Sequence, residues 1–169
     1  MITGGEPLLG WQRVWPALLT MCMEVGLKNV TFETNGSKSV DDVFIEWLNN
    51  EGKDLHVTWS TSPKLSISAE LTKNALIPEC LLSMNKVKNS FLYNKFVIRD
   101  EICLQDVDMF VSAYKKADVK IDSVFLMPEG ATLEQQTLTE KHVAEICMNT
   151  GYKFSPRLHI NLFGNAWGT

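Results

Sequence analysis

Residues 55–64 read LHVTWSTSPK, and this stretch decides the fold class. Apolar side chains at 55, 57 and 59 alternate with polar ones at 56, 58 and 60, which is the period of a strand with two different faces. The strand runs directly into a polar loop, Ser62-Pro63-Lys64. Ligands of α/β proteins bind at the carboxyl ends of parallel strands, so a polar loop at this position is a candidate for function.

The same succession of strand, loop and helix recurs on both sides of this stretch. Further strands are expected to end at Thr3, to cover 29–32, 91–98 and 121–127, and to finish with Leu158, Ile160 and Leu162. Four helices are expected from apolar residues at helical spacing. The first carries Leu18, Leu19, Cys22 and Val25 and ends at Gly26, and the second carries Val40, Val43, Phe44, Trp47 and Leu48 after a cap at Ser39. The third carries Val107, Phe110, Val111 and Tyr114, and the fourth runs from about Leu133 to Asn149 and ends at Gly151. Pro78 interrupts the pattern between 64 and 87, where no element is assigned. Six strands separated by helices predict an α/β fold with parallel pairing, because each crossover must return the chain to the same edge of the sheet.

Composition places the chain among globular proteins, since 45% of its 169 residues are hydrophobic and 21% are charged. The net charge of −4, with lysines and arginines scattered along the chain, provides no basic stripe for a nucleic acid. No apolar run approaches the roughly 20 residues that a bilayer span requires. We therefore expect a cytoplasmic protein with neither a nucleic-acid partner nor a membrane partner, in which residues 1–169 form a single domain.

The cysteines do not form a metal-binding pattern. Cys22, Cys80, Cys103 and Cys147 lie 58, 23 and 44 positions apart, which matches no closely spaced zinc or iron–sulfur motif. Buried free thiols are favoured over a disulfide framework. The three histidines are equally dispersed, so we assign no metal ligand and no catalytic residue.

Four loops that follow expected strands carry glycine-rich or polar sequences. They are Gly4-Gly5-Glu6-Pro7, Glu33-Thr34-Asn35-Gly36, Ser60-Thr61-Ser62-Pro63-Lys64 and Met127-Pro128-Glu129-Gly130-Ala131-Thr132. Paired glycines let a ligand approach main-chain groups without a Cβ in the way. Each loop taken alone also fits an ordinary turn, so their common position at strand ends is the informative feature.

The side chains of these loops suit a zwitterionic ligand that carries a sugar. Glu33 and Asn35 can each bond a ribose hydroxyl or an amino group. Ser62 can donate to a carboxylate, and Lys64 can add an ionic contact. The chain contains neither Gly-x-x-x-x-Gly-Lys nor Gly-x-Gly-x-x-Gly, which argues against a nucleoside triphosphatase or a dinucleotide dehydrogenase.

An ordered set of motifs gives the chain a resemblance to a known family. The set is Thr3-Gly4-Gly5-Glu6-Pro7, Glu33-Thr34-Asn35-Gly36, Ser62-Pro63-Lys64, Lys95-Phe96-Val97-Ile98, Met127-Pro128-Glu129-Gly130 and Ser155-Pro156-Arg157-Leu158-His159-Ile160. It resembles radical S-adenosylmethionine enzymes, and its order and spacing are most similar to the 7-carboxy-7-deazaguanine synthase family of the queuosine pathway. The resemblance covers nearly the whole chain.

The resemblance implies an incomplete (β/α) barrel of six strands whose open mouth holds S-adenosylmethionine and a pterin. Such enzymes cleave S-adenosylmethionine at a [4Fe-4S] cluster, and the resulting radical starts the ring contraction of 6-carboxy-5,6,7,8-tetrahydropterin, with Mg²⁺ assisting. Carried over to this chain, the turn of Gly4, Gly5, Glu6 and Pro7 meets the methionyl amino group, while Ser62 and Lys64 bind the rest of the cofactor. Thr34, Asn35 and Gly36 line the adjoining wall of cofactor and substrate.

Two features depart from the family pattern. The family binds its cluster through C-x3-C-x2-C upstream of the glycine turn, and the four cysteines here cannot replace that motif. We therefore expect the first strand, the cluster loop and the magnesium-binding threonine to be missing, and the chain to be inert by itself. Either a separate N-terminal fragment supplies the cluster or the chain is a truncated remnant. Met127 also stands where many relatives carry a glutamine near the adenine.

Other readings remain open at the level of the sequence. The missing elements would leave a strand edge and apolar faces uncovered, which a partner or a homodimer could cover. One alternative function is a non-catalytic module that binds S-adenosylmethionine or a purine-like ligand. Another is a different radical enzyme, such as an activase acting on a peptide. Whether a product would serve transfer RNA or modified DNA is not decided by these motifs.

Overall fold

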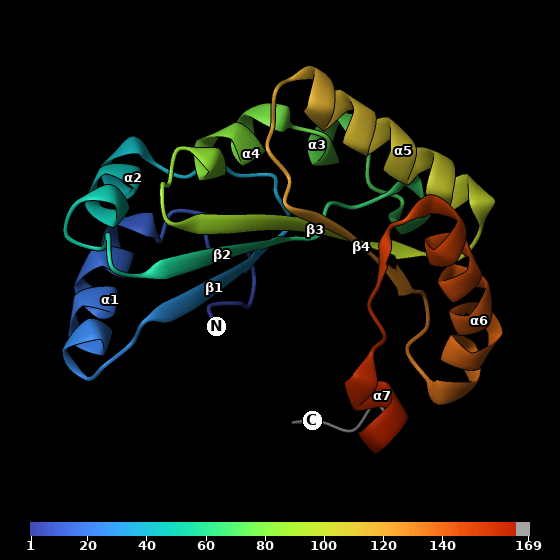
Figure 1. Cartoon of the computed structure of the whole chain (residues 1–169). Helices are drawn as coiled ribbons and strands as arrows, with labels where there is room; N and C mark the ends of the chain where they lie inside the picture. Colours follow the sequence, from blue (N-terminus) through green and yellow to red (C-terminus); the bar gives the residue numbers. More distant parts are fainter. Residues whose placement is uncertain (165–169) are drawn as a thin grey trace.

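The computed structural model describes residues 1–164 of the chain, and its core is a curved parallel sheet (Figure 1). The strands are β1 (Asn29–Thr34), β2 (His56–Thr61), β3 (Ser90–Ile98), β4 (Ser123–Pro128) and β5 (Lys153–Phe154). The helices are α1 (Trp15–Glu24), α2 (Asp42–Asn49), α3 (Thr72–Ala75), α4 (Pro78–Asn85), α5 (Glu101–Lys116), α6 (Leu133–Thr150) and α7 (Leu158–Phe163), with 3-10 turns η1 (Gln12–Val14) and η2 (Ser66–Ser68).

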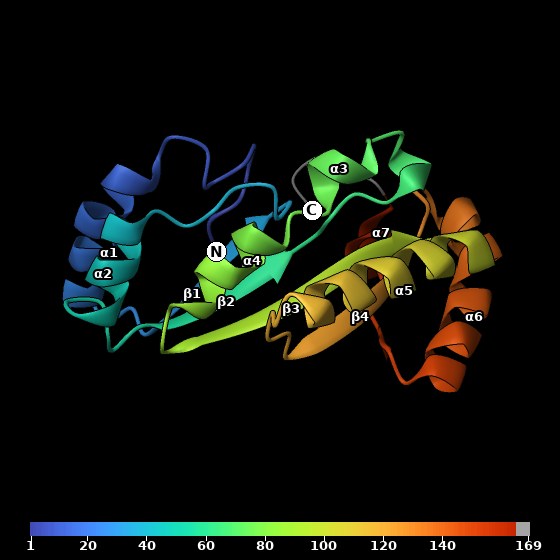
Figure 2. The ribbon, with the colours of Figure 1, turned by 90° about the horizontal axis from the view of Figure 1, so that it is seen from above.

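The sheet follows the order of the chain, β1-β2-β3-β4-β5, and every neighbouring pair is parallel. Helices α1 to α6 form an arch over one face and around the two ends of the sheet, whereas α7 lies on the opposite side (Figures 1 and 2). The expected α/β class is therefore confirmed, and the arrangement is that of an incomplete, open (β/α) barrel. Its parallel strands place all their carboxyl ends along one edge.

Alternation within each strand separates a buried face from a more open one. In β1 the residues at 30, 32 and 34 are buried and those between them are less so. Phe32, Trp59 and Phe96 are fully buried beneath the helices, and Phe32 stacks on Trp59 with ring centroids 5.0 Å apart. Burying rings of this size is a main driving force for folding. The opposite face carries Glu33 and Lys95, so polar groups line the inside of the open barrel.

Local signals explain where the long helices begin and end. Asp100 caps α5, its carboxylate accepting a hydrogen bond from the backbone N–H of Cys103 at 3.0 Å. Thr132 caps α6 in the same way, and α6 ends at Gly151 with a φ of 79°. The expected stop at Gly151 is thus confirmed, because a left-handed residue after a helix favours glycine.

Several expectations about the strands were wrong. The described residues form five strands, and the first expected strand is reduced to a single bridge between Ile2 and Phe32. The alternation from 158 to 162 belongs to helix α7, in which Ile160 is buried while Leu158 and Leu162 are exposed. The last strand lies earlier, at Lys153–Phe154, because the chain turns away from β4 before a longer ladder can form.

Two expectations about the helices were also wrong. The N-cap of α2 is Asp41, and the hydroxyl of Ser39 instead contacts Sγ of Cys80 at 3.6 Å. Val43 is exposed although it shares the apolar spacing of α2. In α1, Leu19 is buried, whereas Leu18 and the following Val25 are exposed. Spacing shows that residues share a face, but the neighbouring elements decide which face is covered.

The expected free thiols agree with the structure. Cys80, Cys103 and Cys147 are buried, Cys22 is half-buried, and none forms a disulfide. Among residues 1–164, we found no helix with the length and apolarity needed to span a bilayer.

Candidate functional site

The loop that contains Glu6 is joined to the loop after β1. One oxygen of the Glu6 carboxylate accepts hydrogen bonds from Oγ1 of Thr34 at 2.6 Å and from the backbone N–H of Leu8 at 3.2 Å. The other oxygen accepts from the backbone N–H of Asn35 at 2.9 Å. Glu6 therefore holds two predicted motifs together, and both of its oxygens are bonded within the chain.

Gly4 and Gly5 lie beside this junction in conformations that side chains rarely adopt. Their φ angles are 90° and 57°, they are exposed, and no atom lies within 4 Å of where a Cβ would stand. Their main-chain groups are therefore open to a ligand. Pro7 is buried, and its carbonyl accepts a hydrogen bond from the indole of Trp15 at 3.1 Å.

Thr34 and Gly36, which the sequence assigned to the substrate wall, are both buried. Oγ1 of Thr34 accepts a hydrogen bond from the N–H of Gly36 at 3.1 Å. A Cβ on Gly36 would come within 3.4 Å of Leu81. In this structure the two residues shape the loop from inside, and substrate contact by them stays a prediction.

Lys95 of β3 links the end of β1 to the loop after β2. Its Nζ lies 2.9 Å from Oε1 of Glu33, and its backbone carbonyl accepts a hydrogen bond from Oγ of Ser62 at 3.0 Å. The second oxygen of Glu33 accepts from Oγ1 of Thr3 at 3.2 Å. The hydrogen bond from Lys95 lowers the pKa of Glu33, and it outweighs the opposing effect of partial burial. Glu33 is therefore held ionised inside the open barrel.

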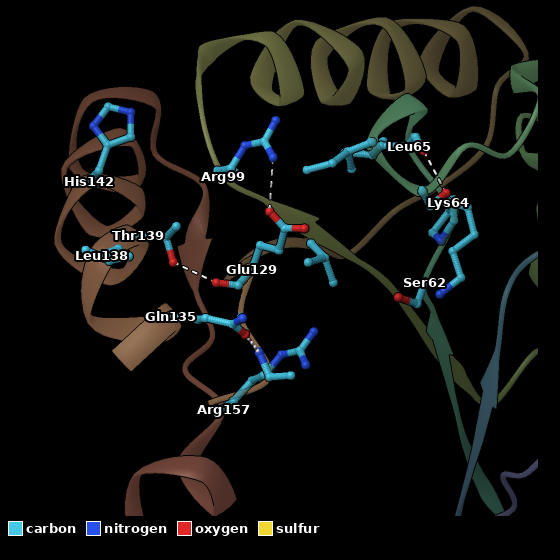
Figure 3. Close-up of a pocket in the computed structure, with 16 residues that line it drawn as sticks. Ser62, Lys64, Leu65, Arg99, Glu129, Gln135, Leu138, Thr139, His142 and Arg157 are labelled. Carbon is cyan, nitrogen blue, oxygen red and sulfur yellow. Dashed lines mark hydrogen bonds and ion pairs between the residues drawn. The ribbon is translucent and has the colours of Figure 1, made fainter. Parts of the chain in front are cut away.

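A cleft of about 810 Å³ lies at the same edge of the sheet (Figure 3). The predicted loops after β2 and β4 contribute Ser62, Lys64, Glu129 and Gly130 to its lining, together with Pro63 and Ala131. Residues to which the sequence assigned no ligand contact complete it: Leu65, Ile67, Ser68, Arg99, Gln135, Leu138, Thr139 and His142, together with Val97 and Arg157 from the quoted motifs. Asn35 and Lys64 also line a neighbouring cavity of about 310 Å³, so the loop after β1 adjoins the cleft.

The first turns of α6 fix the loop after β4. The amide of Gln136, which is fully buried, donates to the carbonyl of Gly130 at 2.9 Å and more weakly to that of Pro128 at 3.4 Å. Oγ1 of Thr139 donates to the carbonyl of Glu129 at 2.8 Å. A Cβ on Gly130 would come within 2.8 Å of the backbone nitrogen of Gln136. These contacts hold the wall of the cleft in one conformation.

The cleft is rich in cationic groups that sequence reasoning missed. Arg99 lies 3.1 Å from Asp100 and 3.7 Å from Glu129, and the hydrogen bond to Asp100 raises the pKa of Arg99. Nε of Arg157 is buried and has no hydrogen-bond partner within residues 1–164. The position of Arg99, directly after β3, was the signal that would have identified it. With Lys64, these groups provide positive charge suited to a carboxylate.

The described residues do not fit a metal cluster. The four cysteines lie on α1, α4, α5 and α6, and no group of three potential ligands converges within residues 1–164. Burial raises the pKa of Cys80, Cys103 and Cys147, which disfavours the thiolate form that iron requires. Within residues 1–164, no three carboxylates converge in a set that could bind magnesium.

A 7-carboxy-7-deazaguanine synthase of Halobacterium salinarum is 28% identical in an alignment of 170 positions that covers 98% of this chain and 65% of that protein. Proteins of the same name from Pyrobaculum aerophilum and Rhodopirellula baltica are each 29% identical and cover 99% and 100% of this chain. Neither a protein-family model nor a solved structure matches the chain.

The chain spans 63 to 66% of the length of these curated relatives. The aligned region includes every motif on which the resemblance was based. The sequence resemblance is therefore confirmed: over almost its whole length, this chain is similar to 7-carboxy-7-deazaguanine synthases.

Proposed function

We propose that this chain provides the part of a 7-carboxy-7-deazaguanine synthase that binds S-adenosylmethionine and the pterin substrate. The whole reaction would convert 6-carboxy-5,6,7,8-tetrahydropterin to 7-carboxy-7-deazaguanine. One observation carries the proposal: loops that are distant in the sequence meet at the carboxyl edge of one parallel sheet, beside a cleft of about 810 Å³. The similarity to three synthases supports it.

The residues of the cleft suit S-adenosylmethionine in size and chemistry. Clefts for small ligands typically enclose about 300–1,000 Å³ and combine apolar walls with a few polar groups. Lys64 and Nε of Arg157, which has no hydrogen-bond partner among the described residues, would meet the carboxylate, and Ser62 would donate to it. Gly4 and Gly5 do not line the cleft, so contact of their main chain with the amino group stays a prediction from the sequence. Leu65, Val97 and Leu138 offer apolar surface to the adenosyl moiety.

S-adenosylmethionine would supply the 5′-deoxyadenosyl group of the reaction once bound. The residues of this chain would orient the cofactor and the substrate. The ionised Glu33, held by Lys95 and Thr3, would present a negative charge to an amino group or to a pterin N–H. The apolar wall would exclude water from the bound groups.

The cluster and Mg²⁺ do not fit the described residues, so we derive no step through them. In the proposed enzyme, a segment with closely spaced cysteines outside residues 1–164 would supply the cluster ligands. Without that segment we expect the chain to bind S-adenosylmethionine but to form no product.

Calorimetric titration with S-adenosylmethionine tests the binding role. We expect saturable binding that weakens about tenfold or more in Lys64→Met, because one charged contact to the carboxylate is lost. Lys141→Met is the matched control, since Lys141 is an exposed lysine of α6 that does not line the cleft and lies 3.9 Å from Glu145. No binding to the wild type, or equal weakening in both variants, would contradict the assignment of the cleft.

Reconstitution with iron and sulfide tests the catalytic role. The chain alone should give no cluster absorbance, whereas a mixture with a polypeptide that contains C-x3-C-x2-C should give absorbance and convert the carboxypterin. If the mixture forms a cluster but transforms only a peptide substrate, the chain belongs to a different radical enzyme.

A second candidate is a non-catalytic module that binds S-adenosylmethionine or a purine. The observation in its favour is that residues 1–164 contain no ligand set for a cluster. This module would release heat with S-adenosylmethionine and yet form no product with any cysteine-bearing partner. Product formation in the mixture would exclude it.

A further inference from the structure

A second cavity, of about 310 Å³, adjoins the cleft, and the segment 64–77 contributes to both. Residues 65, 67 and 68 of this segment line the cleft, whereas residues 70, 73–75 and 77 line the second cavity. Lys64, which Figure 3 shows beside Ser62, lines both. The segment is fixed to α5, because the N–H and the Oγ of Ser66 donate to Oδ2 of Asp106 at 3.1 and 2.5 Å. The two cavities therefore share a wall and one lysine.

Positive charge surrounds the second cavity. Its lining contains three lysines, Lys38, Lys64 and Lys73, and a single carboxylate, Glu70. None of the three lysines forms an ion pair with another of the residues 1–164. Glu70 accepts a hydrogen bond from the side-chain amide of Asn74 at 3.0 Å. A cavity lined by charges of one sign concentrates ions of the opposite sign, so this one favours an anion.

The loop after β1 adds hydrogen-bond donors to the second cavity. Oδ1 of Asn35 accepts the backbone N–H of Ser37 at 2.8 Å, which leaves the amide nitrogen of Asn35 as a donor. Asn35 and Ser37 line the second cavity and do not line the cleft. Three positive charges against one negative leave a formal excess of two, which matches the charge of about −1.5 to −2 on a phosphate group at neutral pH. A single carboxylate would leave part of that excess without a partner.

We propose that the second cavity binds a phosphate group, and that this group competes with the ligand of the cleft for Lys64. Lysine binds phosphate as a point charge, and one ammonium group contacts one anion at a time. Occupancy of either cavity therefore weakens binding in the other, and the effect is reciprocal. The phosphate site goes beyond the proposed function, whereas the competition rests on it, because it requires S-adenosylmethionine in the cleft.

Titration calorimetry of the full chain tests the phosphate site, with inorganic phosphate and ribose 5-phosphate as probes at constant ionic strength. We expect saturable binding that weakens by roughly tenfold or more in Lys38→Met/Lys73→Met, because two cationic contacts are lost. Lys116→Met is the matched control, since Lys116 is an exposed lysine of α5 that does not line the second cavity. These variants replace exposed side chains, so circular dichroism should show unchanged folding.

The two probes also distinguish the source of the phosphate group. Tighter binding of inorganic phosphate would support a site for the free anion, and tighter binding of ribose 5-phosphate would support a site for a phosphate monoester. If neither probe binds, or if Lys116→Met weakens binding as much as Lys38→Met/Lys73→Met does, the phosphate site is overturned.

A second titration tests the competition for Lys64. With the phosphate probe at saturation, the dissociation constant for S-adenosylmethionine should rise roughly fivefold or more in the wild type and stay unchanged in Lys64→Met. Phosphate binding without S-adenosylmethionine binding would contradict the assignment of the cleft and support the phosphate site. S-adenosylmethionine binding without phosphate binding would overturn the phosphate site and leave the proposed function intact. If both ligands bind and neither affects the other, the competition is overturned.

Discussion

Replacing Lys95 by methionine would test how far one ion pair supports the carboxyl edge of the sheet. Nζ of Lys95 lies 2.9 Å from Oε1 of Glu33, and the two side chains are 20% and 33% exposed. Exposed ion pairs contribute about 0–1 kcal/mol, whereas breaking a fully buried pair costs about 3–5 kcal/mol. The pair in this chain lies between these cases. We expect Lys95→Met to lower the free energy of unfolding by about 2 kcal/mol, the typical value of a hydrogen bond to a charged group.

Urea denaturation followed by tryptophan fluorescence measures this loss. Lys141→Met is the control, because its exposed i,i+4 pair with Glu145 should contribute about 0.5 kcal/mol at most. The variants Glu33→Gln and Glu33→Gln/Lys95→Met complete a double-mutant cycle. The double variant should cost less than the sum of the two single ones, since either substitution alone already breaks the pair.

The pH dependence provides a second measurement of the same pair. Because Lys95 lowers the pKa of Glu33, the unfolded chain takes up a proton on Glu33 more readily than the folded chain. The stabilisation is complete above the ordinary glutamate pKa of about 4.3 and is lost as the pH falls through the lowered folded value. The difference in the free energy of unfolding between wild type and Lys95→Met should therefore be largest at neutral pH and should disappear in acid. A difference no larger than that of Lys141→Met, or one that persists in acid, would refute the reasoning.

Three further substitutions test the loop of the cleft and the cap of α5. Gly130→Ala should destabilise the protein by about 2–3 kcal/mol in thermal denaturation, because its φ is 143° and the new Cβ would lie 2.8 Å from the nitrogen of Gln136. Gln136→Leu should cost about 1–3 kcal/mol, since it leaves two loop carbonyls without donors. It should also weaken S-adenosylmethionine binding in calorimetry. Asp100→Ala should cost about 1 kcal/mol at neutral pH through loss of the cap on Cys103. That cost should fade in acid, because the same hydrogen bond lowers the pKa of Asp100. An unchanged melting temperature at neutral pH in any of the three would show that the contact in question contributes nothing.

Short-range patterns were reliable where one segment decides its own structure. Alternation located β2, a run of aromatic and β-branched residues located β3, and the left-handed conformation at Gly151 ended α6 as expected. Alternation misled at 158–162, where one apolar residue faces the core and the segment has no strand to pair with. A segment with alternating apolar residues forms a strand only where another strand can pair with it, and the local sequence does not show whether such a strand is present.

The candidate site divides in a similar way. Polar and glycine-rich loops after strands led to the prediction that Glu6, Glu33, Ser62 and Lys64 bind the cofactor, and this stays a prediction. The structure uses both oxygens of Glu6 within the chain. The cationic contribution of Arg157 was missed, because it comes from the segment before α7, which had been expected to be a strand.

The sequence by itself determined the α/β class, the parallel pairing and the loops that carry polar chemistry, because strand period, helix period and chain crossovers are properties of adjacent residues. Only the tertiary structure decided which of those groups meet. Lys95 and Glu33 are 62 positions apart and come within 2.9 Å because the register of three parallel strands brings them to the same face. That register is set by packing over the entire sheet, and no local pattern records it.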